Sequence, residues 1–219
     1  TSNYINADGG IYGMYFSGVT NYMGNPALIA NNMIHSGGSG SSRGIYITSS
    51  SAQLDFYHNT INVTSTSSIA RSIDFASSAT DSVRLINNIF AIQGPGSAIY
   101  TTSSSASAVV QSDYNNFYSS QGNLATWGSS AMADLAALQS ASGFDANSLS
   151  VDPGFFSTTD LHVTSGLLND KGVVLPGITT DIDGDLRSPV TPDIGCDEFE
   201  PLQNDLTVLG FTSPAALGC

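Results

Sequence analysis

The chain has 219 residues, of which 41% are hydrophobic and only 11% are charged. Lys and Arg total 5 and Asp and Glu total 18, so the formal net charge is -13 at pH 7. This charge argues against a nucleic acid as the main partner, because phosphate contacts need clustered basic side chains. It also argues against docking on an anionic membrane surface, and no apolar run approaches the ~18 residues of a membrane span.

The uncharged polar residues are mainly Ser, Thr, Gly and Asn, which is typical of strands and turns. We therefore expect an all-β protein that is extracellular, either secreted or on a cell surface. Cys196 can pair with Cys219, but the sequence does not decide whether this disulfide forms. Of the 18 acidic residues, 13 follow residue 120, so the negative charge belongs to the C-terminal region.

An internal repeat runs through the first 118 residues. It is marked by an asparagine that recurs every 28 residues, at Asn31, Asn59, Asn87 and Asn115. A second series of short segments, such as residues 44–47 and 72–75, lies between these asparagines. Both series show the alternation of β-strands and are separated by Gly/Ser/Thr tracts. The repeat predicts a solenoid whose turns stack about 4.8 Å apart.

The recurring asparagine has a structural explanation. A coil must bend sharply between its faces, and asparagine tolerates the left-handed backbone that such a bend requires. Stacked asparagine side chains can also hydrogen-bond along the ladder, which satisfies amides that are costly to bury alone. We assign these asparagines a structural role and no catalysis.

A stripe of aromatic and charged side chains is expected on the outer face of the second series. If the alternate aliphatic and Phe residues of these strands point inward, their neighbours point outward from successive coils. The outward residues are Tyr15, Tyr46, Asp74 and Tyr100, and Arg43 and Arg71, which are 28 residues apart, are expected to stack beside them. Aromatic faces suit sugar rings, and arginine suits a uronate carboxylate, so we predict glycan binding here. The alternative is ordinary cross-strand stacking, with Asp74 neutralising the arginines.

An acidic loop near the C-terminus is a candidate calcium site. Asp181, Asp183 and Asp185 alternate around Gly184. Three such carboxylates can converge on Ca²⁺, which takes about six to eight oxygen ligands. Calcium is the one cofactor that the sequence suggests, although the loop lacks the pattern of an EF-hand. The alternative is a polar turn in which Arg187 pairs with one aspartate.

The repeats and the C-terminal sequence together resemble a known family. The Asn-Asn-(Ile/Met/Phe) turns, the Gly-Ile-Tyr-Ile type of strand, and residues 181–189 (DIDGDLRSP) and 192–199 (PDIGCDEF) carry the resemblance. They are similar to bacterial surface proteins with polysaccharide-lyase-like repeats and variable membrane anchors. The resemblance covers about residues 1–200 and implies a right-handed parallel β-helix. Cys196 departs from the small residue usual at that position.

The expected organisation is one solenoid domain followed by the start of another module. Residues 1–200 are predicted to form the β-helix with its closing segment. A short helix is predicted near residues 130–142, capped by Ser130 and ended by Gly143, and we expect it to cover an open end or side of the stack. Residues 201–219 are expected to be a linker and the first strand of an immunoglobulin-like module, within a longer surface polypeptide.

The function favoured by the sequence is a non-enzymatic structural or adhesive module of a secreted or cell-surface protein, for which glycan binding is one candidate role. No His/Asp/Ser constellation and no metal-ligand spacing is recognisable in the repeats. A polysaccharide lyase or glycoside hydrolase is the alternative, and it rests on the resemblance alone. A self-assembling extracellular fibre subunit, which pairs end to end with other copies, is a further alternative because solenoid ends expose unpaired strands.

Overall fold

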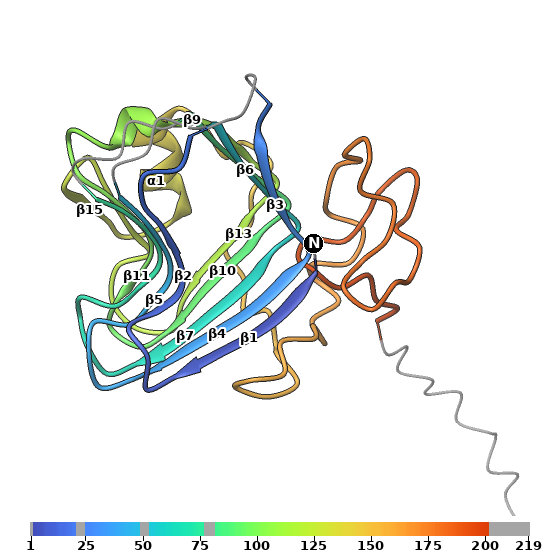
Figure 1. Cartoon of the computed structure of the whole chain (residues 1–219), viewed down its shortest axis with the longest axis horizontal. Helices are drawn as coiled ribbons and strands as arrows, with labels where there is room; N and C mark the ends of the chain where they lie inside the picture. The colour runs from blue at the N-terminus through green and yellow to red at the C-terminus, as the bar shows by residue number, and fades with distance from the viewer. Residues whose placement is uncertain (1, 21–24, 49–52, 77–81, 202–219) are drawn as a thin grey trace, which may run out of the picture.

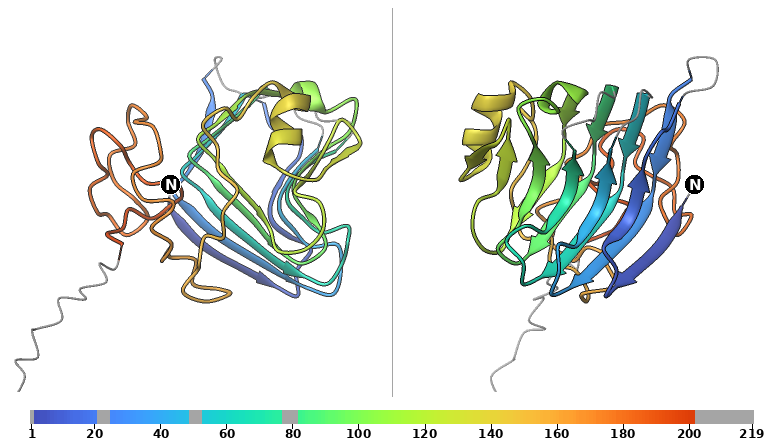
Figure 2. Two further views of the ribbon diagram at one scale, coloured as in Figure 1. Left: turned by 180° about the vertical axis from the view of Figure 1, so that it is seen from behind. Right: turned by 60° about the vertical axis from the view of Figure 1, so that its left-hand side comes forward.

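The computed structural model describes residues 2–20, 25–48, 53–76 and 82–201. The chain winds into a parallel β-solenoid of about four turns, with about 28 residues in each turn. Figure 1 shows the three faces of the coil, and Figure 2 shows the strands of successive turns side by side. The expected all-β solenoid is therefore confirmed, and each full turn contributes one strand to each of three sheets.

Each sheet collects the equivalent strand of successive turns. Sheet A contains β1 (Asn3–Asp8), β4 (Asn32–Gly38), β7 (Thr60–Ser65), β10 (Ile89–Gln93) and β13 (Asn116–Ser119). Sheet B contains β2 (Tyr12–Phe16), β5 (Arg43–Ile47), β8 (Arg71–Phe75), β11 (Ser97–Thr101), β14 (Ala125–Trp127) and β15 (Ser130–Met132). Sheet C contains β3 (Ala27–Ala30), β6 (Gln53–Tyr57), β9 (Ser82–Ile86) and β12 (Val109–Asp113). Among the strands of the described residues, β15 alone pairs antiparallel, with β14.

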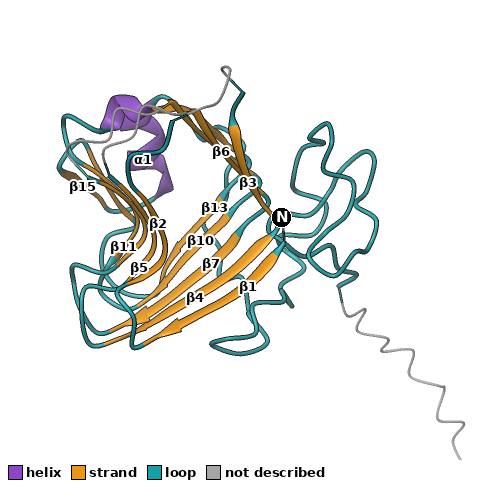
Figure 3. Cartoon of the chain, in the orientation of Figure 1, coloured by secondary structure: helices purple, strands orange, loops and turns teal. Residues whose placement is uncertain are grey.

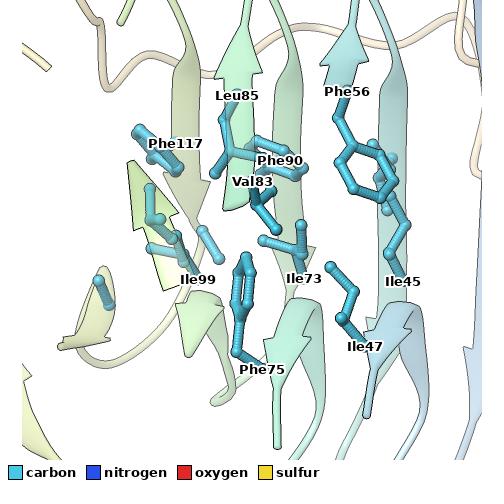
Figure 4. Close-up of a cluster of buried hydrophobic side chains, with 14 of the residues drawn as sticks. Ile45, Ile47, Phe56, Ile73, Phe75, Val83, Leu85, Phe90, Ile99 and Phe117 are labelled. Atoms are coloured by element: carbon cyan, nitrogen blue, oxygen red, sulfur yellow. The ribbon is translucent and has the colours of Figure 1, made fainter. Parts of the chain in front are cut away.

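The interior of the coil is a stack of aliphatic and aromatic side chains. Because side chains alternate along a strand, every second residue of each sheet points inward. In sheet B one inward row is Met14, Ile45, Ile73, Ile99 and Ala125, which pair in register. Figure 4 shows how such side chains from the three sheets meet in the centre. This continuous core gives the solenoid its rigidity.

The corner between sheets C and A carries two neighbouring rows of residues. The outer row has a left-handed backbone, with φ between 53° and 58°, at Asn31, His58, Asn87 and Tyr114. The inner row is a ladder in which each side-chain amide donates to the next side-chain oxygen, through Asn3, Asn32, Asn59, Asn88 and Asn115. The spacing along this ladder alternates between 29 and 27 residues.

The 28-residue spacing of the sequence therefore joins members of both rows. Asn59 and Asn115 lie in the buried ladder. Asn31 and Asn87 lie in the outer row, where their side chains turn toward the C-terminal segment. The two roles foreseen for one asparagine, bending the chain and stacking along the coil, belong to two successive positions.

The expected helix is present but begins later than its sequence pattern predicts. Helix α1 spans Leu135–Ser142, and the Asp134 carboxylate accepts a hydrogen bond from the Ala137 amide as its N-cap. The predicted start at Ser130 is wrong, because residues 130–132 pair with β14 as β15. Gly143 ends the helix with φ 76°, as expected. Leu138 is buried in the core, so α1 covers the end of the stack (Figure 2).

The segment that follows α1 is built mainly of loops and packs outside the corner between sheets C and A (Figures 1 and 3). Its backbone pairs with the outer asparagine row. Asn31 donates from Nδ2 to the Thr180 carbonyl at 2.7 Å. Asn87 donates in the same way to Val173 at 2.7 Å and accepts from the Gly195 amide at 2.9 Å. The segment thus closes over the solenoid wall.

Several expectations concern the end of the chain. Cys196 is buried with a free thiol, whereas its candidate partner Cys219 lies outside the described residues. Apart from residue 201, the expected linker and β module of residues 201–219 also lie outside them. Within the described ranges, no helix has the length and apolar character that crossing a bilayer requires.

Candidate functional site

The outer face of sheet B gathers the aromatic and charged stripe that the sequence indicates. Its strands pair in register, so equivalent outward side chains lie next to one another. One row contains Tyr15, Tyr46, Asp74, Tyr100 and Thr126. The adjacent row contains Tyr12, Arg43, Arg71 and Ser97. All six residues predicted for the stripe therefore lie on one face of adjacent turns.

Three tyrosines form an aromatic platform at one end of this face. Tyr12 stacks on Tyr15 and on Tyr46, with ring centroids 5.3 and 5.1 Å apart. Tyr15 and Tyr46 stack at 5.6 Å. Tyr12 and Tyr15 remain exposed, at 38% and 54%. Sequence reasoning missed Tyr12, although its place three residues before Tyr15 puts it beside Arg43 in the neighbouring strand.

The middle of the face contains an ion pair. Arg43 donates through Nε to the Asp74 carboxylate, and its guanidinium lies 4.8 Å from the centre of the Tyr46 ring. Burial raises the pKa of Asp74, although the hydrogen bond and charge of Arg43 oppose that rise. Burial also raises the pKa of Tyr46, and the nearby Asp74 charge adds to this effect. Arg43 and Asp74 therefore neutralise each other.

Arg71 is different from the other arginines. Arg43, Arg84 and Arg187 each contact a carboxylate, whereas Arg71 has no carboxylate within ion-pair distance in the described part of the chain. Its Nη1 donates to the carbonyls of Ser68 and Ala70, and its guanidinium lies 4.6 Å from the centre of the Tyr100 ring. Burial lowers the pKa of Arg71, but a guanidinium stays charged at neutral pH.

A groove of about 330 Å³ follows this part of the face. It is lined by Arg43, Tyr46, Ile69, Arg71, Asp74, Phe75, Ala76, Tyr100 and Thr102. Its volume is at the lower end of small-molecule sites, which are ~300–1,000 Å³. The lining carries two guanidinium groups and one carboxylate, so the groove is locally cationic on a chain of net charge -13. This combination favours an anionic ligand with flat apolar faces.

The acidic loop does not gather its carboxylates at one point. One oxygen of Asp181 accepts the backbone amides of Asp183, Gly184 and Asp185 at 2.8–2.9 Å. Its other oxygen accepts the Glu198 amide at 2.9 Å. Asp183 instead contacts residues outside the loop, and Asp185 lines a separate pocket. The three carboxylates predicted to bind calcium therefore face different surroundings.

That separate pocket has a volume of about 520 Å³ and is strongly acidic. Its carboxylates are those of Asp170, Asp185, Asp193, Glu198 and Glu200. Burial raises the pKa of Asp193 to about 6. A pocket of this charge repels anions, whereas the groove on sheet B carries an excess of positive charge, so the two concave regions differ in their electrostatic character.

Comparisons of the chain with protein-family models, with curated proteins and with solved structures found no match.

Proposed function

We propose that the chain is a rigid β-solenoid module that binds an acidic polysaccharide along the outer face of sheet B, without cleaving it. The observation that carries this proposal is the guanidinium of Arg71, which has no carboxylate within ion-pair distance among the described residues and lies against Tyr100 in a groove of about 330 Å³. A uronate carboxylate supplies the missing partner of Arg71, because arginine donors match carboxylate oxygens in pairs.

The aromatic residues support a sugar polymer over a small anion. The platform of Tyr12, Tyr15 and Tyr46 continues the face beyond the groove across β2 and β5. Sugar rings have apolar faces that pack on exposed aromatic rings. Since the strands are held in register by the solenoid, the platform and Arg71 keep a fixed separation. A chain of several sugars can therefore contact both without ordering any protein segment.

The same groove offers little for catalysis. A glycoside hydrolase commonly uses two carboxylates on opposite sides of the scissile bond. The groove lining contains one carboxylate, Asp74, and Arg43 already occupies it. A lyase needs a base near the reacting carbon, and the pKa of Tyr46 is raised rather than lowered. Binding is thus better supported than the alternative of a polysaccharide lyase or glycoside hydrolase.

The cellular location of this module and the polypeptide that contains it are also proposals. From the composition and the family resemblance, we place it outside the cell, in a longer polypeptide of a bacterial surface with an immunoglobulin-like module after the solenoid. Growth into a fibre by head-to-tail stacking has less support, because α1 and the antiparallel β15 cover one end of the described coil.

Binding is tested by isothermal titration with polygalacturonate and alginate as acidic polymers and dextran as the neutral control. We expect binding of an acidic polymer that weakens with added salt. Arg71→Ala is expected to weaken it roughly 10- to 100-fold, because a hydrogen-bonded charge contributes ~1.5–3 kcal/mol. The matched control is Arg84→Ala, since Arg84 lies on sheet C and pairs with Asp55 at 3.6 Å.

A second measurement on the same polymers separates binding from cleavage. Size-exclusion chromatography of each polymer after long incubation is expected to show unchanged chain length. Shortening of the polymer by the unmodified protein, but not by the Asp74→Asn variant, would establish the enzymatic alternative. Equal affinity for dextran, or equal loss in the Arg71 and Arg84 variants, would show that this face does not recognise acidic glycans.

A further inference from the structure

A second cluster of chemically active side chains lies within the C-terminal segment, which packs outside the corner between sheets A and C. His162, Asp183 and Asp197 each offer one ligand atom, and these three atoms lie within 4.8 Å of one another. No other group of three such residues occurs in the described ranges. Among the three, Asp183 alone belongs to the acidic loop whose sequence suggests calcium.

Asp197 is the informative member of this cluster. The residue is only 7% exposed, and one of its carboxylate oxygens accepts the Val163 amide at 3.3 Å. Within the described part of the chain, this is the one hydrogen bond that the carboxylate receives. A buried carboxylate is costly unless a cation or several donors compensate it. Asp197 therefore has one oxygen held by Val163, and its carboxylate offers a ligand atom to the cluster.

The other two members are already oriented as ligands. Nδ1 of His162 contacts the Asp160 carboxylate, and Nε2 lies 2.8 Å from Oδ2 of Asp183. A histidine that binds a metal commonly directs its other ring nitrogen to a carboxylate in this way. Tyr4 donates from its hydroxyl to Oδ1 of Asp183 at 2.6 Å, which leaves Oδ2 facing the cluster.

The surrounding fold holds these side chains in place. Each one directly follows a buried residue of one apolar cluster, which contains Met33, Leu161, Ile182 and Cys196. Leu161 donates its amide to the Met33 sulfur at 3.2 Å, and Ile182 donates to the Cys196 carbonyl at 2.9 Å. The three segments that carry the cluster are therefore joined beneath it, although up to 35 residues separate them in sequence.

We propose that His162, Asp183 and Asp197 bind a divalent transition-metal ion, with Zn²⁺ as the best match. One imidazole nitrogen with two carboxylate oxygens suits zinc better than calcium, which prefers oxygen ligands alone. The ion takes the place of the proton between His162 Nε2 and Asp183, and that proton leaves to solvent. Ligand atoms around tetrahedral zinc lie ~3.3 Å apart. The His162–Asp183 pair, at 2.8 Å, must therefore widen slightly, and Asp197, whose ligand atom lies within 4.8 Å of the other two, must approach them.

The proposed ion links the C-terminal segment to the solenoid. Asp183 also contacts Tyr4 of β1, so an ion at this position connects three loops and the first strand of sheet A. His162 and Asp183 are partly exposed, with side-chain exposures of 35% and 43%, and water completes the fourth position. The ion therefore acts as a clamp that solvent can reach.

The test is a titration of chelator-treated full-length protein with ZnCl₂, followed by calorimetry and by the melting temperature. We expect one ion per chain and a melting temperature that rises with Zn²⁺. Co²⁺ as the probe is expected to give the visible absorption of a tetrahedral site. His162→Gln and Asp197→Asn should each weaken Zn²⁺ binding at least 10-fold.

Asp185→Asn is the matched control, because it removes the same charge from the same loop without touching the cluster. It should leave Zn²⁺ binding unchanged. Circular dichroism of each variant without metal establishes that it is folded. The proposal is overturned by the absence of stoichiometric Zn²⁺ binding, by Ca²⁺ binding in place of Zn²⁺, or by an equal loss in Asp185→Asn and the folded His162→Gln variant.

Discussion

The side-chain amide of Asn59 donates to Oδ1 of Asn88 at 2.9 Å, and the same oxygen accepts the backbone amide of Asn59 at 3.0 Å. Asn88 repeats both contacts with Asn115 one turn later. Each asparagine thus satisfies its own side chain and the main chain of its neighbour. At the end of the row, Ser148 accepts the Asn115 amide at 2.9 Å and closes the ladder.

Removing one member of this ladder should destabilise the whole coil. Asn88→Ala leaves the Asn59 amide and the Phe56 carbonyl without their side-chain partners in a fully buried place. Each orphaned group costs ~1–3 kcal/mol, so we expect a loss of about 3–5 kcal/mol in the free energy of unfolding. Urea denaturation measures it. Asn123→Ala, at an exposed position, should change the same quantity by less than about 0.5 kcal/mol.

Close contact between sheets A and B requires glycine at position 44. A Cβ atom there would lie 2.2 Å from Cγ2 of Ile61 and 2.7 Å from the Ser72 carbonyl oxygen. Gly44→Ala must therefore shift backbone as well as a side chain, and we expect a loss of about 1–3 kcal/mol. Gly40→Ala meets nothing within 4 Å and is the control. Similar melting temperatures for the two variants would contradict this prediction.

His58 should make stability depend on pH. Its Nε2 lies 2.9 Å from the Asn87 amide nitrogen, and its Nδ1 lies 3.2 Å from the Gly195 carbonyl. Burial, aided by the Arg187 charge, holds the pKa of His58 well below its ordinary value. Below about pH 6.5 the unfolded chain binds this proton and the folded chain does not, so stability falls as the pH drops. Above about pH 6.5 the contribution of His58 is constant.

The variant His58→Asn tests whether His58 lowers the free energy of unfolding as the pH drops. Asparagine occupies the equivalent left-handed positions 31 and 87, so the backbone accepts it. We expect the free energy of unfolding to fall less steeply from about pH 6.5 to pH 5 in the variant, by up to ~1.4 kcal/mol per pH unit. His35 retains a contribution of the same sign, because burial lowers its pKa too. Parallel curves for both proteins would contradict the role of His58.

The sequence predicts the coil well because its signal is local and repeated. Alternation within each strand, Gly/Ser/Thr tracts between strands and the recurring asparagine all describe one turn at a time. The same alternation places Tyr46, Asp74 and Tyr100 in one outward row, as the structure shows. The alternation of 29 and 27 residues within the ladder is not evident from the sequence. The asparagines spaced by 28 residues belong alternately to the outer row and to the ladder.

The remaining features depend on contacts between distant segments. Ser130 has the character of a helix cap, but pairing with Trp127 draws it into β15. The cluster of His162, Asp183 and Asp197 forms only because three loops pack on one apolar cluster. No spacing in the sequence indicates such a meeting. Sequence reasoning therefore placed Asp183 in a loop-bound calcium site instead of beside a histidine.

Arg187 shows how the closing segment is held, and it supports the last prediction. It is 7% exposed and donates to Glu198 at 3.2 Å, to the Asn31 side chain at 3.0 Å and to the Gly195 carbonyl at 3.0 Å. It therefore joins the segment to itself and to the solenoid corner, across 156 residues of sequence. Breaking a buried pair of this kind costs ~3–5 kcal/mol, since Glu198 keeps the Ser188 and Asp193 amides as partners but loses its counter-charge.

Arg187→Ala should therefore loosen the closing segment before the coil unfolds. Limited proteolysis followed by mass spectrometry is expected to cut residues 150–200 faster in the variant, while the strands of sheets A to C stay protected. Arg84→Ala is the matched control, because its ion pair with Asp55 is partly exposed and contributes ~0–1 kcal/mol. Cleavage that starts within the coil, or at equal rates in both variants, would mean that Arg187 does not hold the segment independently of the solenoid.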